Sequence, residues 1–270
     1  MFDSAKLKVE RASEQIDEIL AISEISPPFT YVLETDTMTG ERATFSELNH
    51  ISLKKLVIRC GEVFHNLRSA LDHAYWEAVV PYIEDESKHG AIQFPFAKDS
   101  SKLEQAIKSR LAHQVSEEFF NLILSFKPCN GSDGNELLSL LHEVNILDKH
   151  KFPTPVGDFT RISSVDIRTQ VPDFPVGLTD VTFGGCRRDV AWRTNSIDPR
   201  MLGDIVPPTT CIFHRPLSVP VDIVLRMATI DYSESLITTL TKMRTEVLNI
   251  LTLMSKAELY PSTLKPNKAG

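Results

Sequence analysis

Arg68, Asp72 and His73 are residues whose types and spacing could do chemistry, and they lie close together in the stretch GEVFHNLRSALDHAYWEAVV. A guanidinium can bind a phosphate through paired hydrogen bonds, and an imidazole can take up or release a proton near neutral pH. A carboxylate one helical turn from the arginine can orient it. We therefore take Arg68, Asp72 and His73 as candidate catalytic residues that would bind an anion and transfer a proton.

The stretch itself predicts one long helix, from about Leu53 to about Tyr82, with two unlike faces. One face is apolar, whereas the other carries residue types that are poorer helix formers than the Lys and Glu of an ordinary wet surface. This second face indicates either a ligand site, to which His65 and Asn66 would contribute, or a buried hydrogen-bonded network in which Arg68 pairs with Asp72.

The spacing from Arg68 to His73 resembles the R-x(4–6)-H motif of HEPN domains, helical modules many of which are metal-independent endoribonucleases or their inactive relatives. The resemblance implies that Arg68 stabilises the charge that develops on an RNA phosphate and that His73 acts as general acid or base. Asp72 and Asn66 would orient them. It also implies a homodimer, in which two copies flank the phosphate, and no metal or other cofactor.

A second cluster lies in LHEVNILDKHKF, where helical spacing places His142, Asn145 and Lys149 on one face and His150 at the helix end. Lys and His near a helix C-terminus favour the negative end of the helix dipole and can cap its carbonyl groups. Alternatively, Asn145, Lys149 and His150 face Arg68 and His73 and bind the same anionic ligand. The segments FHNLRSALDH, FPF and NILDKHK together also resemble a group of uncharacterised bacterial proteins, which implies no activity.

Two E-x-x-H pairs, Glu47 with His50 and Glu62 with His65, have the spacing by which di-iron bundles present ligands. Such a site needs these pairs on different helices, whereas here they fall on neighbouring turns. His65 and His73 are about 12 Å apart along a helix axis, too far to bind one ion together. We expect no bound metal.

Composition limits the partners of the protein. The net charge of -7 argues against a wide nucleic-acid-binding surface, although a local site for RNA is compatible with it. The four cysteines form no C-x-x-C pair, which favours a reducing, cytoplasmic setting. The N-terminal stretch lacks the apolar core of a secretory signal, and no segment has the roughly 20 apolar residues that span a bilayer, so we expect no membrane association.

The elements that must position these residues indicate an α+β fold. Residues 1–152 are predicted to form a bundle of long helices that carries a β-hairpin at FTYVLETDTMTGERATFSEL. Residues 153–230 are rich in β-branched residues between Pro and Gly and should form an antiparallel sheet. Residues 231–260 should form a C-terminal helix that packs back on the bundle.

Two functions follow as hypotheses from this arrangement. The first is a HEPN-like RNA-cleaving or RNA-binding protein that uses Arg68 and His73 without metal. The second is a non-catalytic interaction or dimerisation module, in which the polar helix face is a structural network. Exposure of Arg68 and His73 to solvent discriminates between the two.

Overall fold

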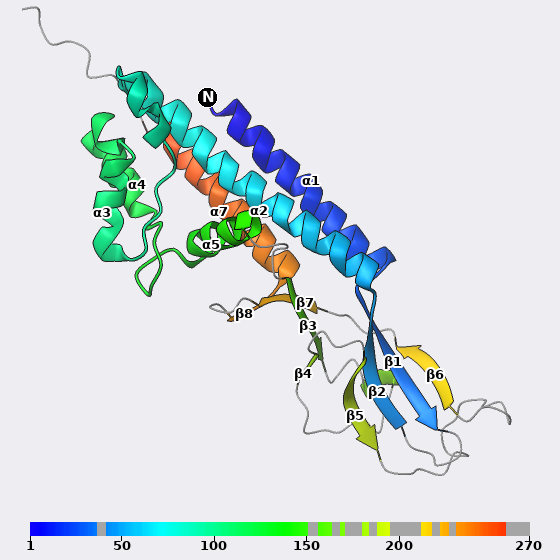
Figure 1. Ribbon diagram of the computed structural model, residues 1–270. Coiled ribbons are helices and arrows are strands. Elements are labelled where there is room, and N and C mark those ends of the chain that lie inside the picture. Colours follow the sequence, from blue (N-terminus) through cyan, green and yellow to red (C-terminus); the bar gives the residue numbers. More distant parts are fainter. Residues whose placement is uncertain are drawn as a thin grey trace, which may run out of the picture. The chain divides into compact units, whose positions relative to one another are not determined.

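The computed structural model describes residues 1–36, 42–150, 156–163, 168–170, 180–183, 188–194, 212–217, 222–226 and 231–257 (Figure 1). Its fold is α+β, a bundle of long helices with a hairpin, a β-rich insertion and a returning C-terminal helix. The chain forms two compact units. The helical unit comprises residues 1–17, 59–154 and 240–270, and the sheet unit comprises residues 18–58 and 155–239, so far as the structure describes them.

Three long helices contribute to the helical unit: α1 (Asp3–Ile25), α2 (His50–Val79) and α7 (Leu236–Lys256). α2 begins where the Asn49 side chain accepts a hydrogen bond from the backbone N–H of Ser52, and it ends just before Pro81, in the short 3-10 helix Val80–Tyr82. The predicted apolar stripe of α2 is confirmed, because its members are all fully or almost fully buried: Val63, Phe64, Leu67, Ala70, Leu71, Ala74, Tyr75 and Ala78.

Shorter helices complete the helical unit: α3 (Ser100–Ser109), α4 (Glu117–Ser125) and α5 (Glu136–His150). Ser116 begins α4, since its hydroxyl accepts a hydrogen bond from the backbone N–H of Phe119. The 3-10 helix Glu86–Ala91 and an extended segment around Phe94 join α2 to α3, and an isolated bridge pairs Ala97 with Cys129. The FPF segment is therefore an extended link between the helices α2 and α3.

α7 confirms the predicted C-terminal helix in its apolar stripe, whose members within the helical unit are buried: Leu240, Met243, Val247, Ile250, Leu251 and Met254. The side chain of Glu246 accepts a hydrogen bond from Asn135, just before α5, so α7 returns to the bundle. The structure differs at the start, because Asp231–Ser235 is strand β8 rather than helix. This short run has no helical apolar stripe, and it pairs with the preceding strand instead.

In its described residues, the sheet unit contains two four-stranded antiparallel sheets. The first has the order β5-β2-β1-β6 and is built on the predicted hairpin, which is confirmed by the pairing of β1 (Phe29–Asp36) with β2 (Arg42–Leu48). β5 (Arg188–Thr194) and β6 (Ile212–Leu217) join its two sides. The second has the order β4-β3-β7-β8, with β3 (Val156–Ser163), β4 (Asp180–Phe183) and β7 (Asp222–Arg226).

The described residues of the 153–230 segment are strand except for the helical turn at 168–170, which agrees with the antiparallel sheet predicted there. β1 has three consecutive buried residues, Tyr31, Val32 and Leu33, so both of its faces are covered. A hydrogen bond of 2.8 Å joins His214 of β6 to the carboxylate of Glu34 on β1, at a paired position of the sheet.

Candidate functional site

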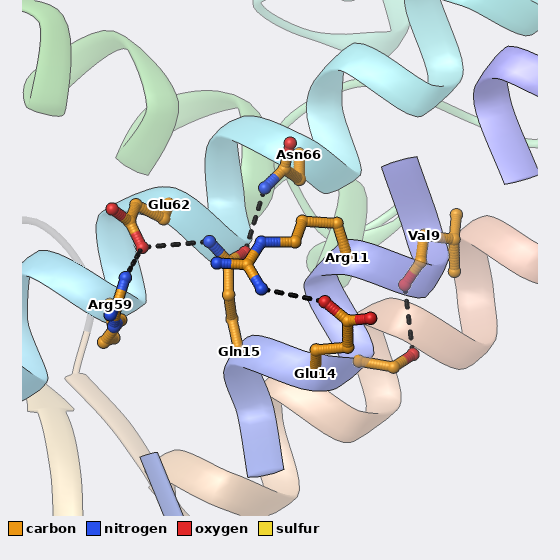
Figure 2. A network of polar contacts seen from close by, with 8 residues as sticks. Val9, Arg11, Glu14, Gln15, Arg59, Glu62 and Asn66 are labelled. Carbon is orange, nitrogen blue, oxygen red and sulfur yellow. Dashed lines mark hydrogen bonds and ion pairs between the residues drawn. The ribbon is translucent and has the colours of Figure 1, made fainter. Parts of the chain in front are cut away.

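One side of the polar face of α2 is occupied by α1. The amide of Gln15 on α1 donates a hydrogen bond of 2.9 Å to Glu62 and accepts one of 2.9 Å from Asn66. Glu62 also pairs with Arg59 at 2.6 Å, and Asn66 accepts a bond from Lys8. Figure 2 shows Gln15 between Glu62 and Asn66, so this part of the face is a contact between two helices.

The same contact continues toward the C-terminal end of α2. The hydroxyl of Ser4 lies 2.7 Å from Nδ1 of His73, and both carboxylate oxygens of Glu77 accept the backbone N–H of Phe2, at 2.9 and 3.0 Å. Residues early in α1 thus meet residues late in α2, while Gln15 meets Glu62, so the two helices run antiparallel. His73 is nevertheless exposed to solvent, since Ser4 covers only one edge of its ring.

Arg68 lies on another side of α2 and is buried, with 8% of its surface exposed. Its Nη2 donates to the Asp72 carboxylate at 2.8 Å and to the carbonyl oxygen of Phe94 at 3.0 Å. The same carboxylate oxygen of Asp72 accepts the backbone N–H of Phe94 at 2.9 Å. Arg68 and Asp72 therefore tie α2 to the extended segment around Phe94.

The guanidinium of Arg68 also lies over the ring of Phe96, 4.3 Å from the ring centroid. His142 of α5 is stacked on Phe96 as well, with centroids 4.3 Å apart and planes inclined by 6°. Both contacts are at the distances at which flat rings and guanidinium groups attract one another. Arg68, Phe96 and His142 thus connect α2, the extended segment and α5, and we call these three residues with Asp72 the Arg68 cluster.

The pKa of Arg68 is lowered to about 10, mainly by burial; the Asp72 carboxylate opposes this shift, and the positive charge of Arg110 contributes to it. Arg68 stays protonated at neutral pH, so the cluster holds a buried cation whose charge is paired with Asp72. Its Nη1 is buried and makes no hydrogen bond to the residues that the structure describes.

The predicted catalytic residues divide between two environments. Arg68 and Asp72 belong to the buried cluster, whereas His73 lies about 140° further round the helix, beside α1. Nothing in the described part of the chain hydrogen bonds Arg68 to His73. One copy of the helix therefore does not bring this arginine and this histidine together.

The predicted ligand-binding residues are also spread out. His65 is exposed and lies 3.5 Å from the Ser69 hydroxyl one turn away, and Asn66 is buried against Gln15. Asn145 is buried on α5, on which His142 joins the Arg68 cluster. Lys149 and His150 are the last residues of α5, and their side chains lie outside the described residues.

A groove of about 570 Å³ lies next to His73 and is lined by Ser4, His73, Trp76, Glu77, Val80 and Pro81, and we call it the His73 groove. Trp76 is 42% exposed, and its ring meets His89 edge to face, with centroids 5.6 Å apart. No arginine or lysine is among the described residues that line the groove. Of the three predicted catalytic residues, only His73 lines the groove.

Sequence reasoning missed the roles of Ser4, Glu77 and Phe96. Ser4 and Glu77 look like ordinary helix-surface residues in the sequence, and only the packing of α1 on α2 shows their partners. Phe96 stands in a segment without helical or strand periodicity. The one available signal was the pair of aromatic residues around a proline in FPF, which is unusual for a solvated link.

The described ranges contain no group of three or more His, Cys, Asp or Glu side chains that could hold a metal ion. Glu62, one of the E-x-x-H residues, is bonded to Gln15 and Arg59. No described helix is long and apolar enough to cross a membrane.

No protein-family model, curated protein or solved structure matches the chain.

Proposed function

We propose that the protein is a non-catalytic interaction module in which the polar face of α2 is a structural network. The observation that carries this proposal is the burial of Arg68, whose guanidinium is bonded to Asp72 and Phe94 and covered by Phe96. An arginine that stabilises a phosphoryl transition state must reach the phosphate oxygens. The charge of Arg68 is instead used in contacts that hold together α2, the extended segment around Phe94 and α5.

The rest of the polar face supports the same function. Glu62 and Asn66 bond to Gln15, and His73 and Glu77 bond to the first residues of α1. Buried or half-buried polar groups that are matched in this way fix one packing of two helices over others. This accounts for residue types that an ordinary wet helix face does not need.

Cleavage of a mixed RNA pool tests the proposal. We expect no cleavage by the wild-type protein, and no difference between the wild type and His73→Ala. His65→Ala is the matched control, because His65 is an exposed histidine of the same helix outside the groove. Cleavage that His73→Ala abolishes and His65→Ala retains would overturn the proposal. Cleavage that all three proteins share would leave no activity to assign to His73 or His65.

A second candidate function is the HEPN-like one, in which Arg68 and His73 act on RNA. Two observations favour it: Arg68 Nη1 has no hydrogen-bond partner among the described residues, and His73 is exposed. An RNA phosphate could reach Nη1 only if the segment around Phe94 and Phe96 moved. A second copy would then supply the other half of the site. RNA cleavage that requires both Arg68 and His73, in a protein that sediments as a dimer, is the result expected of this function.

A further inference from the structure

We propose that the His73 groove binds the positively charged side chain of an arginine or lysine in a partner protein, above Trp76 and beside Glu77. The inference deepens the proposed function and rests on it, since it names the kind of partner that the interaction module would take. It concerns a surface that the Arg68 cluster does not use and that borders the contacts of His73 and Glu77 with the start of α1.

The aromatic wall of the groove is the first argument. Trp76 exposes 42% of its surface and lies outside the buried apolar stripe of α2. The edge-to-face contact with His89 holds the indole in place, and His89 is itself fixed by a hydrogen bond of 3.1 Å to the carbonyl oxygen of Ile83. A tryptophan face held open to solvent is the strongest of the side-chain surfaces that attract organic cations.

The charge around the groove is the second argument. Glu77 carries a carboxylate that bonds only to the neutral N–H of Phe2, and no lysine or arginine of the described residues forms an ion pair with it. The acidic run Glu84 to Glu86 lies in the segment that leads from Ile83 to His89, the residue that contacts the indole. In this run Asp85 pairs with Lys88, so Glu84 and Glu86 add negative charge. The groove therefore favours a cation and repels an anion.

The shape of the cation follows from the remaining lining. Val80 and Pro81 are apolar and can cover the methylene stem of a long side chain whose charged end meets Glu77. A bare metal ion does not fit, because among the lining residues only His73 and Glu77 are ordinary metal ligands. A guanidinium or ammonium group on an alkyl stem matches both the carboxylate of Glu77 and the apolar lining.

The partner can be tested with a matched pair of small probes, N-acetyl-arginine methylamide and its citrulline analogue, which replaces the guanidinium by a neutral urea of the same shape. Binding is followed by the shifts of backbone amide resonances in residues 73–80 of the full-length protein. We expect the arginine probe to bind at least about tenfold more tightly than the citrulline probe. Equal binding of the two probes would overturn the inference.

Variants locate the binding. Glu77→Gln removes the charge but can still accept the N–H of Phe2, and it should weaken the arginine probe by about tenfold. Trp76→Leu should weaken it by about fivefold. Glu118→Gln, an exposed position of α4 outside the groove, changes the net charge equally and should leave binding unchanged. An equal loss in Glu77→Gln and Glu118→Gln would show non-specific attraction and contradict the site.

A third probe, n-butylguanidinium, separates a protein side chain from a free small guanidinium compound, because it carries the same single charge without the flanking amides. Tighter binding of the arginine probe supports a protein partner, and tighter binding of n-butylguanidinium overturns it. The outcome is independent of the RNA experiment. Cleavage lost in His73→Ala would overturn the proposed function whatever the probes do, whereas equal binding of the arginine and citrulline probes would overturn the inference and leave that function standing.

Discussion

The guanidinium of Arg68 lies over the ring of Phe96, 4.3 Å from its centroid, in the buried part of the helical unit. This contact makes Arg68, on the polar face of α2, part of the packing of the chain. A guanidinium that is covered by an aromatic ring and bonded to Asp72 acts on the packing of its own chain. The same contact makes the stability of the protein, rather than its chemistry, the property most sensitive to Arg68.

Arg68→Ala should lower the free energy of unfolding by about 3–5 kcal/mol, because it leaves Asp72 without its cation and removes the stack on Phe96. Urea unfolding of both proteins measures the difference. Arg59→Ala is the control, since Arg59 pairs with Glu62 at a half-exposed position and should cost less than about 1 kcal/mol. Equal losses in the two variants would contradict a structural role that is special to Arg68.

The stability of the protein should fall as the pH rises above about 9. Burial raises the pKa of the Cys60 thiol well above its ordinary value of 9.0, so above that pH the unfolded chain releases a proton that the folded chain keeps. The unfolded state then binds fewer protons, and stability decreases with pH. Cys60→Ala should remove this contribution, which is roughly 1 kcal/mol from pH 9 to pH 10. Parallel pH profiles for the wild type and Cys60→Ala would be the contrary result.

Ser116→Ala should destabilise the protein by about 1 kcal/mol, because the backbone N–H of Phe119 loses the hydroxyl that accepts its hydrogen bond at the start of α4. Asp99→Ala is the comparison at the start of α3, where the side chain accepts the hydroxyl of Ser101 but forms no side-chain cap on the helix. It should cost less than Ser116→Ala. Thermal unfolding monitored by circular dichroism ranks the two variants, and the reverse order would count against the capping argument.

Gly134→Ala should be strongly destabilising, by at least about 2 kcal/mol, since a methyl group at this position would overlap the backbone carbonyl oxygen of Cys129. The backbone at Cys129 cannot move freely, because its carbonyl oxygen also accepts the buried hydroxyl of Ser139. Gly90→Ala is the matched control, as nothing lies within 4 Å of the added methyl group. The free energies of unfolding of both variants measure this difference. A similarly small destabilisation by Gly134→Ala and Gly90→Ala would refute the prediction.

Helical periodicity was enough to predict which residues of α2 and α7 are buried, because each helix has one continuous apolar stripe. The β-hairpin could be predicted for a similar reason, from two β-prone runs around a turn. The sequence could not predict that β5 and β6 flank this hairpin, because pairing between strands more than a hundred residues apart leaves no local pattern.

The candidate site was harder to predict than the fold. Periodicity places Arg68 and His73 on the polar part of the helix, but it does not say which segment covers each of them. Arg68 is covered by Phe96, which comes from a segment without period, and His73 is bonded to Ser4 at the start of another helix. The roles of Arg68, Asp72 and His73 in catalysis stay predictions. Their surroundings depend on long-range packing that the sequence does not display.

The amide of Gln15 donates to Glu62 through its nitrogen and accepts from Asn66 through its oxygen, so a single orientation of the group satisfies both neighbours. A carboxylate at position 15 would repel Glu62, and a side chain of reversed polarity would need its two partners exchanged. Substitutions at positions 15, 62 and 66 should therefore be tolerated in concert rather than singly. Among homologous sequences, we expect the residues at positions 15, 62 and 66 to change together.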